Sequence, residues 1–173
     1  AFSAGHDLKE MTARRADPDR GRAYFSDLMA RCAAMMLRIP DLPQPVIAAV
    51  AGVAAAAGCQ LVASCDLAVA GSDAKFSTPG VHIGLFCSTP MVALSRNVSR
   101  KHAMAVLLTG DTASADKAAI MGLVNEAVAP GAEFARAMEL AQQIASKSSH
   151  VIGIGKAAFY RQIEMPLADA YRY

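Results

Sequence analysis

The hydrophobic positions of the chain follow two different periods, which predicts short strands interleaved with helices. Apolar runs of strand length predict three buried strands, at residues 46–50, 66–70 and 123–128. Two further segments are predicted to be extended, at 75–78 and 81–85. Helical spacing of apolar residues predicts five helices, over 22–38, 101–108, 114–121, 133–146 and 151–160. Strands that alternate with helices predict an α/β domain, followed here by an all-helical tail.

Residues that start or stop elements refine these boundaries. Residues 40–45 contain three prolines and are predicted to end the helix over 22–38. Ser88-Thr89-Pro90 predicts a helix start with a hydroxyl cap and a proline in the first turn. Ser114 and Gly122 are the expected N-cap and end of the helix between them. Residues 12–21 are predicted to be an exposed connection.

The most informative stretch of the pattern runs from Val46 to Asp66. It begins as an apolar strand, continues through small residues at 51–58, and becomes a helix with Leu61, Val62 and Cys65 on one side. The first amides of a helix lack acceptors and lie at the positive end of its dipole, so they favour an anion. Small residues in such a turn let a ligand approach the backbone. The stretch predicts a turn that holds developing negative charge on a substrate.

The same stretch has no charged residue from Val46 to Cys65, so its length would also admit a membrane span. Its Ala and Gly content is high, however, and Gln60 and Ser64 lie within it. It lacks both the large apolar residues that drive insertion and a basic flank. We therefore predict a buried core segment and no membrane span.

Composition narrows the class of protein further. Of the 173 residues, 54% are hydrophobic and 18% are charged, which excludes disorder and suits one core-rich domain. A net charge of +2 without a basic block does not indicate nucleic-acid binding. The four cysteines form no C-x-x-C pair and have no histidine at metal spacing, so we expect free thiols and no metal site. The chain opens on motif residues and ends inside a helical pattern, and we expect a fragment.

Four segments together resemble one family. Residues 2–8 (F-S-A-G-H-D-L) resemble the A-G-x-D-[IL] loop of the enoyl-CoA hydratase/isomerase (crotonase) superfamily, and residues 45–66 resemble its second signature. Residues 109–113 and 122–126 resemble its later T-G…A…G-L-V pattern. The resemblance implies a crotonase-like α/β fold, a spiral of β-β-α turns in the ClpP/crotonase manner. It implies a core over 1–128 that lacks its N-terminal part, an incomplete C-terminal helical segment over 129–173, and homotrimers or homohexamers.

The resemblance also implies a function and site residues. Members bind an acyl-coenzyme A thioester and polarise its carbonyl with two backbone amides, which by position are those of His6 and Ala57. Such preorganised donors stabilise a thioester enolate by roughly 2.7–4 kcal/mol each. By the same resemblance Ala4, Leu8 and Lys9 contact the adenine and pantetheine. Coenzyme A is part of the substrate, and no separate cofactor is implied.

Two positions depart from the family pattern. The resemblance places the two carboxylates of the hydratases at Gln60 and Gly80, and neither residue is a carboxylate. Glutamine can orient a water but cannot take its proton, so ordinary hydration is disfavoured. His82, the side chain of His6 and Cys87 are candidate substitutes, although His82 is more typical of a satisfied polar residue and Cys87 of a buried thiol. We expect a variant with glutamate at both positions to gain hydration.

Three functions stay open on the sequence. The first is a lyase or isomerase that uses the oxyanion hole alone, as in decarboxylation of a malonyl-type thioester. The second is a hydratase that works through His82 or through a water held by Gln60. The third is a non-catalytic acyl-CoA-binding protein. The family implies a cytoplasmic protein in a bacterium and a mitochondrial-matrix protein in a eukaryote. Asp7 and Asp66 are expected to brace loop and helix ends.

Overall fold

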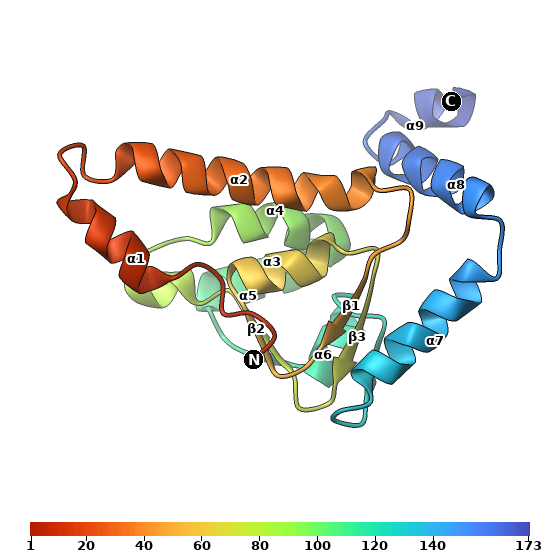
Figure 1. Cartoon of the computed structure of the whole chain (residues 1–173), viewed down its shortest axis with the longest axis horizontal. Coiled ribbons are helices and arrows are strands. Elements are labelled where there is room, and N and C mark those ends of the chain that lie inside the picture. Colours follow the sequence, from red (N-terminus) through yellow and green to blue (C-terminus); the bar gives the residue numbers. More distant parts are fainter.

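The computed structural model describes residues 1–173 and contains two small sheets, and the first four strands of the chain alternate between them (Figure 1). The first sheet is parallel and has the order β1 (Ile47–Val50), β3 (Leu67–Gly71), β6 (Glu126–Val128). The second has the order β2 (Val53–Ala55), β4 (Lys75–Ser77), β5 (Ala113–Ser114), with β5 antiparallel to β4. β1 and β2 therefore lie in different sheets, and so do β3 and β4.

A helix follows each of these strand pairs, which gives the β-β-α repeat that the family resemblance implies. β1 and β2 lead into α3 (Ala57–Ser64), and β3 and β4 lead through the 3-10 helix η2 (Pro79–Ile83) into α4 (Ser88–Asn97). The parallel register aligns Ile47 with Leu67 in one sheet and Val53 with Lys75 in the other. The strand pair β3 and β4 thus lies directly beside the pair β1 and β2.

The hydrophobic core lies between the sheets and the inner helices, which are α3, α4, α5 (Arg100–Thr109) and α6 (Ala115–Met121). Its largest buried apolar side chains are at most 1% exposed and are those of Val50, Val62, Phe76, Leu94 and Leu107. Burial of one such side chain stabilises a fold by about 1.5–3 kcal/mol, so this core supports the turn between β2 and α3. Alanines fill many of the remaining inner positions and let the sheets and helices approach closely.

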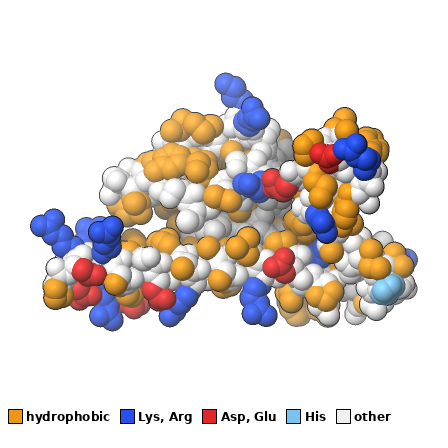
Figure 2. All heavy atoms as spheres, turned by 90° about the horizontal axis from the view of Figure 1, so that it is seen from above, with side chains coloured by type: hydrophobic (Ala, Val, Ile, Leu, Met, Phe, Trp, Pro, Cys, Tyr) orange, Lys and Arg blue, Asp and Glu red, His pale blue; other side chains and the backbone are white.

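Further helices lie outside this core. α1 (Leu8–Ala13) and the 3-10 helix η1 (Arg14–Ala16) lead into α2 (Arg22–Asp41), which lies along α3 and α4 in Figure 1. The chain ends with α7 (Glu133–Ala145), α8 (Ser149–Gln162) and α9 (Leu167–Arg172). Figure 2 shows hydrophobic side chains over these C-terminal helices, where the exposed ones include Val151, Ile154, Phe159, Leu167 and Tyr171. No helix of the structure is both long enough and apolar enough to cross a membrane.

Several predicted boundaries are wrong for local reasons. Residues 81–85 are not extended, because Pro79–Ile83 forms η2 and Gly84 then takes a left-handed conformation at φ 74°. Helix α2 continues through Pro40 to Asp41, since a proline in the last turn removes only one hydrogen bond. The predicted strand over 123–128 is shorter and begins at Glu126. The predicted connection over 12–21 contains the end of α1 and all of η1.

Other local predictions are confirmed or corrected by hydrogen bonds. Ser114 caps α6 by accepting from the Lys117 amide, and Gly122 ends that helix in a left-handed conformation, as predicted. Ser88 is not a hydroxyl cap, because the N-cap position of α4 is Cys87 and no side chain caps that helix. The strand β2 was not predicted, since its three small residues look like part of a turn in the sequence.

Candidate functional site

The N-terminal loop is attached to the edge of β2. The Ser3 amide donates to the Val53 carbonyl at 3.0 Å, and the Ala55 amide donates to the Ser3 carbonyl at 2.8 Å. Ser3 and Ala54 form a parallel bridge. The loop that carries His6 is therefore positioned as an added strand of the second sheet, next to the turn that begins α3.

Two glycines let the loop and the start of α3 come together. A Cβ on Gly58 would lie 2.2 Å from the Ser3 carbonyl oxygen, which no side chain can tolerate. A Cβ on Gly5 would lie 3.1 Å from the Ala57 amide nitrogen, and Gly5 itself has φ +91°. Glycine is the residue that permits both the close approach and the left-handed backbone. The two segments of the predicted site are thus in direct contact.

The residue before α3 has a strained backbone. Ala56 has φ 50° and ψ −117°, a conformation that costs a non-glycine residue roughly 1–3 kcal/mol and persists only where the surroundings impose it. Its amide donates to the Ser77 carbonyl of β4 at 3.0 Å, which fixes the turn. The amides of residues 57–59 and of His6 donate no hydrogen bond within the chain. The loop and α3 therefore present free donors where they meet.

The far side of the loop is fixed by the start of α1. Asp7 is the N-cap of that helix and accepts from the Lys9 amide at 2.8 Å and the Glu10 amide at 3.3 Å, as expected for a structural residue. Of the three residues with an expected coenzyme A contact, Leu8 is 55% exposed, and Ala4 and Lys9 are also exposed. Lys9 forms no ion pair in the structure, so its ammonium is available to an anionic ligand.

Two polar side chains of this region each carry a buried atom without a hydrogen-bond partner. Gln60 lies in the first turn of α3 and is 5% exposed, and its Oε1 accepts no hydrogen bond. The Nε2 atom of His6 is likewise buried and unpaired. Buried polar atoms in native proteins are nearly always hydrogen-bonded, so an unpaired atom needs an explanation. Both of these residues belong to the predicted site.

Gly80 has no room for a side chain. A Cβ there would lie 2.4 Å from the Leu85 carbonyl oxygen and 2.8 Å from the Cys87 sulfur. A glutamate at this position therefore requires a shift of the backbone after η2. Our expectation that Gln60→Glu combined with Gly80→Glu gains hydration is not compatible with this geometry, whereas Gln60→Glu alone is nearly isosteric.

The remaining sequence candidates have partners or lack chemical activation. The Nε2 atom of His82 lies 3.3 Å from the Gly110 carbonyl oxygen, so this imidazole is satisfied within the fold. Cys87 is 7% exposed, in keeping with a buried thiol. Burial, with a contribution from Cys87, raises the pKa of the Cys59 thiol to about 12. No group of three or more His, Cys, Asp or Glu side chains is placed to hold a metal ion.

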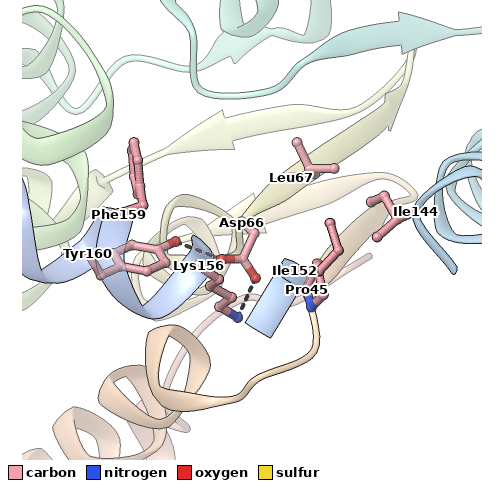
Figure 3. Close-up of a pocket in the computed structure, with 8 residues that line it drawn as sticks. All are labelled: Pro45, Asp66, Leu67, Ile144, Ile152, Lys156, Phe159 and Tyr160. Carbon is pink, nitrogen blue, oxygen red and sulfur yellow. Dashed lines mark hydrogen bonds and ion pairs between the residues drawn. The ribbon is translucent and has the colours of Figure 1, made fainter. Parts of the chain in front are cut away.

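A different polar cluster was only partly predicted. Asp66 accepts from Lys156 Nζ at 2.7 Å and from the Tyr160 hydroxyl at 2.9 Å (Figure 3). It also accepts from the Val46 amide at 2.6 Å. Lys156 also donates to the carbonyls of Ile39 and Gln44, at 2.8 and 3.0 Å. The sequence marks Asp66 as structural but gives no sign of its partners Lys156 and Tyr160, which lie on α8. The one sequence signal is that Lys156 and Tyr160 are four residues apart, which places them on the same face of a helix.

Two cavities lie away from the predicted site. One of about 260 Å³ surrounds the Asp66 cluster and is drawn in Figure 3. The other, of about 740 Å³, lies between β1 and α7, where Ile47 and Ala49 face Ala137 and Ala141. The helix face predicted from Phe134 and Met138 lines this groove, and these two side chains remain 68% and 44% exposed. Neither cavity includes the first loop or the start of α3.

Comparisons with known proteins point to one family. The family model described as enoyl-CoA hydratase/isomerase matches residues 1–173. The human mitochondrial enoyl-CoA hydratase domain-containing protein 3 is 50% identical over 171 residues, which are 98% of this chain and 54% of that protein. A probable enoyl-CoA hydratase of Rhizobium meliloti is 33% identical over all of this chain and 65% of its own length.

Solved structures identify the same fold. The crystal structure of an enoyl-CoA hydratase from Mycobacterium smegmatis has a TM-score of 0.93 and 55% identity, over 99% of this chain and 65% of that one. The human domain-containing protein 3 has a TM-score of 0.91 and 48% identity, over 99% of this chain and 66% of that one. The chain spans about half the length of the first of these relatives and has the α/β crotonase fold. It belongs to the enoyl-CoA hydratase/isomerase family.

Proposed function

We propose that the chain binds an acyl-coenzyme A thioester, with the carbonyl oxygen of the thioester against the amides of His6 and Ala57. The observation that carries this proposal is the contact between the first loop and α3. It places Gly5 beside the Ala57 amide, and it leaves the amides of His6 and Ala57 without acceptors in the chain. Family membership supports the ligand class.

The chemistry of such a site is stabilisation of a thioester enolate. Negative charge that develops on the carbonyl oxygen is met by donors that are already oriented, so no solvent has to reorganise during the reaction. The strained turn at Ala56 and the steric limit at Gly58 fix those donors. We propose that Ala4, Leu8 and Lys9 meet the coenzyme A portion, since all three are exposed beside the site.

The type of reaction depends on the missing carboxylates. We propose an enoyl-CoA hydratase-like lyase or isomerase whose ordinary hydration is weak, because Gln60 and Gly80 offer no group that exchanges a proton near neutral pH. Decarboxylation of a malonyl-type thioester is the second candidate. It is favoured by the same observation, since loss of carbon dioxide generates the enolate without a protein base. A non-catalytic acyl-CoA-binding protein is the third.

One experiment separates these functions. Crotonyl-CoA and methylmalonyl-CoA are each incubated with the protein, products are followed by mass spectrometry, and binding of both is measured by calorimetry. Turnover of methylmalonyl-CoA alone supports the decarboxylase, and binding without turnover supports the binding protein. Hydration of crotonyl-CoA at ordinary hydratase rates contradicts a role for the missing carboxylates. Absence of thioester binding contradicts the whole proposal.

Assembly and compartment are also proposals. We propose a homotrimer or homohexamer formed through the C-terminal helical segment over 129–173, supported by the exposed apolar side chains of α8 and α9. The segment over 1–128 then acts as the core that carries the site. We propose a cytoplasmic location in a bacterium and the mitochondrial matrix in a eukaryote, the second supported by the word "mitochondrial" in the names of the animal relatives.

A further inference from the structure

We draw no further inference here: the strongest candidate, the apolar groove of about 740 Å³ between β1 and α7, lies along the unpaired edge strand of the first sheet, and nothing in the structure shows what covers it.

Discussion

The protein contains two regions of buried polar groups, one around Asp66 and one at the start of α3. They differ in whether those groups have hydrogen-bond partners. Around Asp66, every polar group has a partner, since its carboxylate accepts three hydrogen bonds and Lys156 donates three. Around the start of α3, the amides of His6 and Ala57 and the side chain of Gln60 have none. A saturated cluster, in which every polar group is hydrogen-bonded, stabilises one structure. An unsaturated cluster, in which buried polar groups have no partner, indicates a ligand site. The difference separates the element that attaches α8 from the candidate site.

The largest expected effect is on the saturated cluster. Lys156→Met leaves the Asp66 carboxylate buried without its cation, and breaking a buried pair in this way costs about 3–5 kcal/mol. Urea denaturation measures the free energy of unfolding. Asp66→Asn added to Lys156→Met removes the unpaired charge and is expected to recover part of the loss. A Lys156→Met protein as stable as the wild type contradicts the structural role of this cluster.

The next effect concerns the contact that builds the candidate site. Gly58→Ala places a Cβ 2.2 Å from the Ser3 carbonyl oxygen, so the first loop must move away from α3. We expect a loss of stability of about 1–3 kcal/mol and a loss of acyl-CoA affinity of at least about tenfold. Calorimetry on the folded protein measures the affinity.

Gly155→Ala is the matched control for that substitution. Gly155 lies within α8, and a Cβ there meets nothing within 4 Å. Alanine is the better helix former by roughly 1 kcal/mol, so this variant is expected to be slightly more stable and to bind as before. Equal thioester affinity in Gly58→Ala and Gly155→Ala would show that the loop contact does not shape the site.

A pH titration compares one thiol from each region. Burial raises the pKa of Cys59, beside Gln60, to about 12, and that of Cys65, beside Asp66, to about 11, both from 9.0. A raised pKa means that the folded state holds the proton longer than the unfolded state. The contribution of these two thiols to the free energy of unfolding is therefore fully present below about pH 9. Above that pH it falls by up to about 1.4 kcal/mol for each pH unit and thiol.

Alanine variants assign the two parts of this decline. Cys65→Ala is expected to remove the part of the decline in unfolding free energy that ends near pH 11. Cys59→Ala is expected to remove the part that continues to about pH 12. Urea denaturation at several values between pH 8 and pH 12 measures both. Identical pH profiles for the wild type and the two variants would mean that neither thiol is protected by the fold.

The smallest expected effect has the opposite sign from the first. Gln60→Met removes a buried acceptor that has no partner, so the folded protein loses nothing and gains up to about 1 kcal/mol. Lys156→Met and Gln60→Met are similar exchanges of a buried polar side chain for methionine. A clear destabilisation by Gln60→Met would place Gln60 with the saturated cluster and not with the ligand site.

Much of the fold was predictable because local patterns determine it. The strand β1 at Ile47–Val50, the caps at Ser114 and Gly122, and the α/β order all follow from residues close in the sequence. The strand β2 and the helix η2 were missed, since their residues carry a local signal for turns and strands that the neighbouring strands and Gly84 override. Local propensity is a weak guide where tertiary pairing decides the conformation.

For the candidate site, the sequence by itself determined the residue types: small residues before α3, His6 in the loop, and Gln60 and Gly80 at the two positions where the family resemblance implies carboxylates. Only the tertiary structure decided that Gly58 admits no side chain against Ser3, that Gly80 admits none against Leu85, and that His82 is satisfied by Gly110. It also joined Lys156 to Asp66 across 90 residues. A sequence states which groups are present, but whether a polar group is paired depends on distant segments that only folding brings within hydrogen-bond distance.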